Sequence, residues 1–171
     1  MFRGLFARLT GRPGRGQELF DIAVEEARQT HWFLDGGVPD TVSGRFAVLA
    51  TIVALLTVRL ERGGPAGELA SVALTERLVE ALDTELREMG LGDPTLGKQV
   101  RKLVGSVGGR VERWRALVDG EGNWPGEIVR SLDLPSPHEP AALRHCETAR
   151  RALWQKFTLS GVEELVEGRI Q

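Results

Sequence analysis

Apolar residues recur every three or four positions along most of the chain, which is the spacing of one face of an α-helix. Segments rich in glycine, proline and small polar residues separate the stretches that carry this pattern. The alternation of apolar and polar residues that is typical of strands does not compete with it. We therefore predict a single compact all-α domain of about five to seven helices, with long helices near residues 17–30, 43–62, 66–89, 94–118 and 139–157.

The longest apolar run covers residues 46–58, which is shorter than the roughly 20 residues that a membrane span needs. Its apolar positions fall on a helical stripe without charge, formed by Phe46, Leu49, Ile52, Val53 and Leu56. This pattern predicts a buried core helix that neighbouring helices cover. The alternative is a groove that binds an apolar client.

The connection at residues 86–98 is built from residues with separate backbone roles. Gly90 suits the left-handed conformation that ends a helix, and Gly92 keeps the connection short. Asp93 is expected to cap the next helix, and Pro94 suits its first turn. This connection therefore predicts a helix, a tight turn and a second helix.

Charge changes sign between the two helices that this connection joins. In the first helix, Glu76, Glu80 and Asp83 lie beside a row of leucines. In the second, residues 98–115 hold six basic residues and one acidic residue, Glu112. At about 100° per residue, one side of the second helix gathers four cations and two glycines, which we call the basic face: Lys98, Arg101, Lys102, Gly105, Gly109 and Arg113.

The two glycines of the basic face need a physical reason, because glycine in an exposed helix costs roughly 1 kcal/mol relative to alanine. We expect that another helix, a phosphate backbone or a lipid headgroup layer lies against this face, while the cations steer the encounter. Two alternatives stay open. The face is solvated and pairs with the acidic helix, or the glycines admit another helix of the same domain.

Residues 1–16 differ in charge from the rest of the chain, since no acidic residue precedes Glu18. Apolar residues at helical spacing and nearby arginines predict a short amphipathic arm, carried by Phe2, Arg3, Leu5, Phe6, Arg8 and Leu9. A helix this short is marginal alone, so it is expected to order on an anionic bilayer, in a partner groove or on its own domain. The alternative is a frayed terminus. Residues 17–171 form the predicted helical domain.

Composition limits the chemistry of the chain. The net charge of −2 argues against coating of nucleic acid by bulk charge. The single cysteine, Cys146, excludes an intramolecular disulfide and fits a reducing compartment. No phosphate loop, nucleophile elbow or zinc spacing is present, and His138 and His145 make a weak metal pair. We therefore expect no enzyme activity, no catalytic residue, no cofactor, no metal and no small-molecule substrate.

Three motifs together resemble those of the ubiquinol-cytochrome c chaperone family: residues 38–46, residues 86–98 and the dipeptide Gly109-Arg110. The resemblance runs from about residue 19 to about residue 131. Arg45 and Arg110 match arginines of the family motifs. They are expected either to contact a partner or to hold helix ends together, by pairing with carboxylates such as Asp40 or Asp93 and donating to free carbonyls.

The resemblance implies a non-enzymatic assembly chaperone for ubiquinol-cytochrome c reductase (respiratory complex III). Its client would be newly synthesised cytochrome b or another reductase subunit, bound near the membrane or the ribosome, with a second assembly factor as a further partner. The alternative is a ribosome- or RNA-binding module, or an adaptor on an anionic membrane surface, that acts through the basic helix at residues 98–115. We expect a bacterial cytoplasmic protein, peripheral on the inner membrane, ahead of one on the matrix side of the mitochondrial inner membrane.

Overall fold

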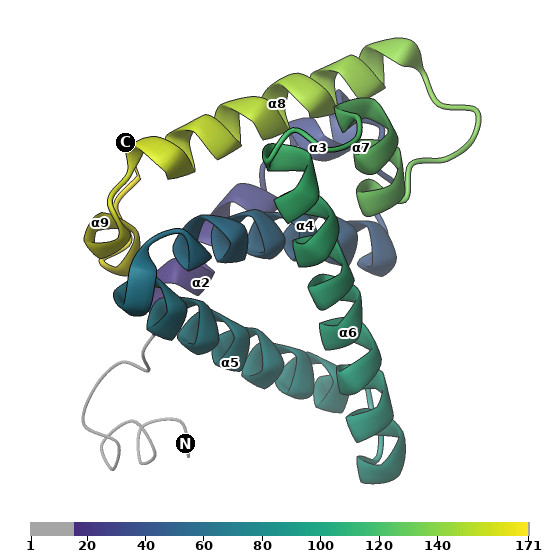
Figure 1. The fold of residues 1–171 in the computed structure, drawn as a ribbon. Coiled ribbons are helices and arrows are strands. Elements are labelled where there is room, and N and C mark those ends of the chain that lie inside the picture. Colours follow the sequence, from purple (N-terminus) through teal and green to yellow (C-terminus); the bar gives the residue numbers. More distant parts are fainter. Residues whose placement is uncertain (1–15, 171) are drawn as a thin grey trace.

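The computed structural model describes residues 16–170, which form eight α-helices and no strand in that range (Figure 1). The helices are α2 (Gln17–Ala27), α3 (His31–Leu34), α4 (Val42–Glu61), α5 (Gly64–Glu88), α6 (Asp93–Val118), α7 (Trp124–Leu132), α8 (Pro140–Leu159) and α9 (Val162–Val166). The all-α class and the five long helices are confirmed. Three short helices, α3, α7 and α9, were not expected as separate elements. The amphipathic arm, with Phe2, Arg3, Leu5, Phe6, Arg8 and Leu9, lies outside the described residues.

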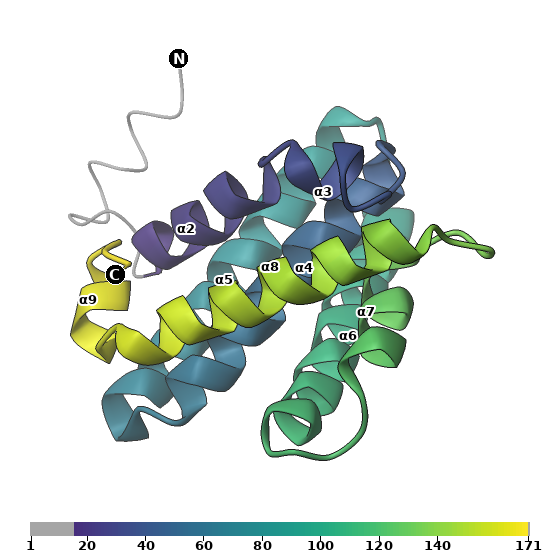
Figure 2. The ribbon, with the colours of Figure 1, turned by 90° about the horizontal axis from the view of Figure 1, so that it is seen from above.

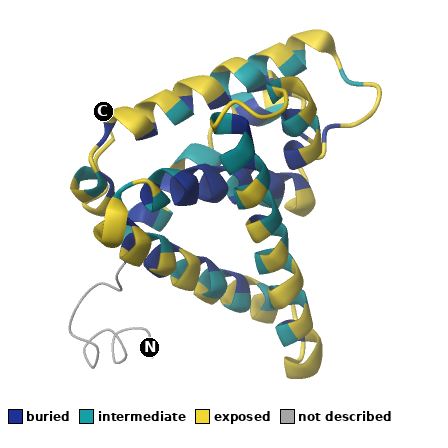
Figure 3. Ribbon diagram, in the orientation of Figure 1, coloured by how far each residue is buried: buried dark blue, intermediate teal, exposed yellow. Residues whose placement is uncertain are grey.

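Helix α4 is the centre of the fold, because α2, α5, α6, α7 and α8 all contact it. Every residue from Ala50 to Val58 is buried. By length and composition alone α4 could cross a membrane, but 67% of its most apolar window is buried inside the protein. Figure 3 shows this burial as a dark segment surrounded by more exposed helices. The prediction of a buried core helix at residues 46–58 is therefore confirmed.

Helix α5 packs against the backbone at the end of α4 at Gly67. A Cβ atom added to Gly67 would lie 1.9 Å from the carbonyl oxygen of Leu60 in α4, and 2.9 Å from its carbonyl carbon. Both neighbours are backbone atoms, so no side-chain rotation relieves the overlap. The chain reverses direction between α4 and α5 through residues 62–63. A side chain at Gly67 would clash with the end of α4 in this tight connection.

Helices α5 and α6 form a hairpin whose closed end projects from the rest of the fold (Figure 1). Gly90 takes the left-handed conformation with φ of +86°, as predicted. Asp93 is not the cap of α6, because Gly92 occupies the extended N-cap position and Asp93 begins the helix. There its negative charge interacts favourably with the positive N-terminal end of the helix dipole. Its carboxylate also accepts a hydrogen bond of 2.9 Å from Arg87, which donates to Asp83 as well.

Helix α8 lies across α4 on the side of the molecule that Figure 2 faces, and packs against α7. Cys146, Leu153 and Phe157 are buried, and Leu143 packs against the core, as their shared helical face predicts. The C-terminal helices therefore belong to the same core as α2 to α6.

Candidate partner-binding surface on α6

The first half of α6 presents three exposed cations, Lys98, Arg101 and Lys102. Among the described residues, none of the three forms an ion pair or a hydrogen bond through its side chain. Most other surface arginines among the described residues form ion pairs, as Arg45, Arg62, Arg87 and Arg151 do. The three cations are therefore exposed and unpaired within the part of the chain that the structure describes.

The acidic residues of α5 do not neutralise these cations. Glu80 pairs with Arg77 and Asp83 pairs with Arg87, both on α5 itself. The ion pair that joins the two helices runs from Arg87 to Asp93, at the turn. The alternative in which the basic face pairs with the acidic helix is therefore wrong.

The glycines of the basic face border open space. A Cβ atom added to Gly105, or to its neighbour Gly108, would have no heavy atom within 4 Å, and one added to Gly109 would meet only the flexible end of Arg113, at 3.3 Å. No other helix of the described domain lies against these positions. The alternative in which the glycines admit a helix of the same domain is therefore wrong, and the surface is open to an external partner.

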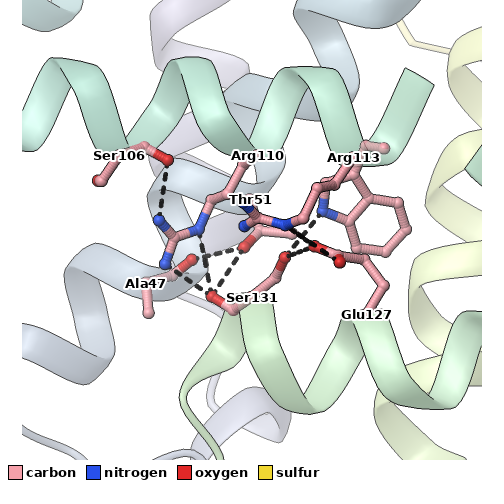
Figure 4. Close-up of polar contacts among 8 residues, drawn as sticks. Ala47, Thr51, Ser106, Arg110, Arg113, Glu127 and Ser131 are labelled. Carbon is pink, nitrogen blue, oxygen red and sulfur yellow. Dashed lines mark hydrogen bonds and ion pairs between the residues drawn. The ribbon is translucent and has the colours of Figure 1, made fainter. Parts of the chain in front are cut away.

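The second half of α6 turns its cations inward (Figure 4). Arg113 donates to the carboxylate of Glu127 in α7 at 2.9 Å and 3.1 Å. Arg110 donates to the carbonyl oxygen of Ser131 at 2.8 Å and 3.2 Å and to that of Ser106 at 3.1 Å. Burial, together with the charge of Arg113, lowers the pKa of Arg110. The predicted basic face therefore has two halves. The free half carries the unpaired cations Lys98, Arg101 and Lys102, and in the other half Arg113 is paired with Glu127 of the same chain.

Arg110 belongs to a polar network that joins α4, α6 and α7 at Ser131 (Figure 4). The hydroxyl of Thr51 donates to Ala47 at 2.7 Å and to the carbonyl of Ser131 at 3.4 Å. The buried indole of Trp114 donates to the Ser131 hydroxyl at 3.2 Å, and that hydroxyl donates to Glu127. Because Ser131 is in the last turn of α7, its carbonyl has no partner within the helix. The expectation that Arg110 holds a helix end is confirmed.

Arg45 lies in the first turn of α4 and pairs with Asp40 at 2.6 Å, as expected. Its guanidinium also lies over the ring of Phe33, 5.5 Å from the centroid. The side chain remains 62% exposed. Arg45 therefore steadies the loop before α4, and its predicted contact with a partner stays a prediction.

The contact between α3 and α8 brings together residues that the sequence did not connect. His31 Nδ1 lies 2.9 Å from His145 Nε2. The guanidinium of Arg150 lies 4.0 Å from the ring centroid of Trp32, and both side chains are fully buried. Cys146 donates to the carbonyl of Gly36 at 3.3 Å. Burial raises the pKa of the Cys146 thiol to about 11, so it stays protonated and unreactive at neutral pH.

Acidification is expected to weaken this contact through His31. Burial lowers the pKa of His31, and the nearby His145 and Arg150 lower it further. The carboxylates of Glu26 and Asp35 raise it, but the net change is downward. The unfolded chain, with an ordinary histidine pKa of about 6.5, then binds more protons than the folded one, so stability is full above that pH and falls below it. Unfolding by urea between about pH 7.5 and 5.5 should show a smaller loss in His31→Gln than in wild type. An equal loss in both proteins would contradict this.

A model described as ubiquinol-cytochrome C chaperone matches residues 34–121, half of the chain. The chain belongs to the ubiquinol-cytochrome c chaperone family. The matched segment contains α4, α5 and α6, and with them Arg45, Arg110 and the basic face. Membership of a chaperone family implies a role in complex III assembly by binding rather than by catalysis.

The fold is also similar to that of a solved protein, described as the Cbp3 homolog from Brucella abortus. The two share 24% sequence identity and superpose with a TM-score of 0.72 over 100% of this chain and 96% of the other. At this identity the likeness shows the fold alone. A comparison with curated proteins finds no match.

Proposed function

We propose that this chain is a non-enzymatic assembly chaperone for ubiquinol-cytochrome c reductase that binds newly synthesised cytochrome b, or another subunit of that enzyme, on the free half of the basic face. The family match supports the role in assembly. The observation that carries the binding site is the coincidence of unpaired Lys98, Arg101 and Lys102 with the open positions of Gly105 and Gly109.

The physical argument for this site has two parts. Unpaired cations on a projecting helix attract an acidic partner over about one Debye length, roughly 8 Å in physiological salt. Glycines then remove side-chain bulk where the partner must approach the α6 backbone. Arg113 and Arg110 contribute by fixing α6 to α7, so that the free half is presented in one orientation.

A phosphate backbone is the second candidate partner, because the same unpaired cations would bind it. This alternative makes the chain a ribosome- or RNA-binding module, or an adaptor on an anionic membrane. Binding of either partner through these cations weakens with rising salt, so the identity of the captured molecule, rather than the salt dependence, distinguishes the two candidates. We propose a bacterial cytoplasmic location, peripheral on the inner membrane, where either partner would be met.

Charge reversal of the free half is expected to abolish capture of cytochrome b. The test is crosslinking and pull-down of the tagged chain from its host, with Lys98, Arg101 and Lys102 all changed to Glu. Arg113 is left unchanged, because its reversal would also break the pair with Glu127. The matched control reverses Arg28, Arg144 and Lys156, three exposed cations elsewhere on the surface, so that net charge changes equally.

Recovery of cytochrome b with wild type and the control, but not with the α6 variant, would support the proposal. Equal recovery with all three proteins would remove the client site from α6. Recovery of ribosomal RNA or lipid that depends on the α6 cations, with no cytochrome b in any sample, would replace the proposal by the phosphate-binding alternative.

A further inference from the structure

The outer side of α5 carries an exposed apolar pair, Leu69 and Val72. Their side chains are 68% and 56% exposed, although most large apolar residues of the described chain are buried. The spacing of Leu69, Val72 and Glu76 places all three on one side of the helix, and Glu68 is exposed beside Leu69. In Figure 3 this outer side of α5 is the exposed one. The surface is therefore a small apolar patch with an acidic border.

The chain enters the described fold against α5 at Ala73, on the buried side of the helix but at the same level along its axis as this patch. Gly16, with φ of +89°, packs so closely on α5 that an added Cβ atom would lie 2.7 Å from the carbonyl carbon and oxygen of Ala73. The next residue, Gln17, accepts a hydrogen bond from Arg77 one turn further along α5. Ala73 follows Val72 directly and lies about 6 Å along the helix axis from Leu69, at 1.5 Å per residue.

The segment that precedes Gly16 has the complementary chemistry. Its apolar stripe is Phe2, Leu5, Phe6 and Leu9, and its arginines occur without any acidic residue. Residues 10–15 can span at most about 20 Å at 3.3–3.6 Å per residue, which is ample to return the stripe to α5. A tether this short also gives an effective concentration in the millimolar range.

We propose that residues 2–9 dock on the outer side of α5, with the apolar stripe covering Leu69 and Val72 and the arginines facing Glu68 and Glu76. This docking does not depend on the proposed function, because the patch lies on α5 and the client site lies on α6. In this proposal the arm covers an exposed surface of its own domain. A surface held by so few residues is easily vacated, so a stronger competitor for the arm would expose the patch.

The test is paramagnetic broadening in the full chain. Ala7→Cys places a nitroxide on the side of the predicted arm helix opposite its apolar stripe, and the buried, protonated Cys146 does not take the label. We expect amide signals of residues 68–76 to lose more intensity than those of α2 and α9, which also surround Gly16. The variant L69K/V72K should recover those signals, because lysines remove the apolar contact and repel the arginines.

The control L34K/L159K changes two other exposed apolar residues, 79% and 64% exposed, and should leave the broadening intact. Two results would overturn the proposal. One is broadening of α2, α5 and α9 alike that L69K/V72K does not alter, which is the pattern of a tethered but undocked arm. The other is broadening of residues 68–76 when a spin-labelled, unenriched chain is mixed with an unlabelled, isotope-enriched chain, because the arm would then come from a second copy.

Discussion

Replacing Gly67 with alanine is expected to lower the free energy of unfolding by about 1–3 kcal/mol, the cost of overpacking a filled core. The added Cβ atom would lie 1.9 Å from the Leu60 carbonyl oxygen, so α4 and α5 must move apart. That movement loosens contacts along the whole crossing, including those of the buried Leu74. Urea denaturation followed by far-UV circular dichroism measures the change.

The same substitution at Gly105 is the matched control and should have the opposite sign. Gly105 also lies inside a helix, but an added Cβ atom meets nothing within 4 Å. Alanine there should raise the free energy of unfolding by about 0.5–1 kcal/mol, since it restricts the unfolded chain and favours the helix. Equal effects of Gly67→Ala and Gly105→Ala would contradict the close crossing of α4 and α5.

Gly105→Ala also separates stability from binding. If a partner approaches the backbone of α6 at this position, the variant should be more stable than wild type and yet capture less client. If stability rises and client capture is unchanged, the cations alone form the binding site and Gly105 is not part of it. The glycine would then be a cost without a matching function.

Helical periodicity predicts the long helices well because each spans several turns and has one apolar side. The three short helices contain four, nine and five residues, too few for such a pattern to be visible. For α7 a local signal was present and was missed. Asn123 accepts a hydrogen bond from the amide of Gly126 at 2.7 Å as the N-cap, and Pro125 lies in the first turn, as capping rules predict.

The site could be predicted only in part from the sequence, for a related reason. A helical projection places Arg113 with Lys98, since both lie on the same side of α6. It cannot show that α7 brings Glu127 to Arg113, or that the carbonyl of Ser131 recruits Arg110. Partners that are distant in sequence, such as His31 and His145, depend entirely on how the helices pack.

Arg150→Met is expected to raise the free energy of unfolding by about 1–4 kcal/mol, the range seen when well-packed apolar residues of similar volume replace buried ionic groups. Arg150 is fully buried, and its three guanidinium nitrogens have no hydrogen-bond partner among the described residues. Burial lowers its pKa to about 10, so the group is still charged at neutral pH. The charge is therefore buried in the core without the hydrogen bonds that usually offset the cost of removing such a group from water.

Two interactions of Arg150, with the ring of Trp32 and with the charge of Glu26, limit the expected gain. Its stacking on Trp32 offsets the cost by about 0.5–2 kcal/mol. Methionine keeps an unbranched, flexible side chain there and is expected to place its sulfur against the ring. The attraction to Glu26 acts without a hydrogen bond. The control is Arg144→Met on the same helix, where the side chain is exposed and the change should stay within about 0.5 kcal/mol. A lower stability of Arg150→Met than of Arg144→Met would mean that Trp32 and Glu26 together outweigh the desolvation of the guanidinium, and that α3 is held to α8 by this charge.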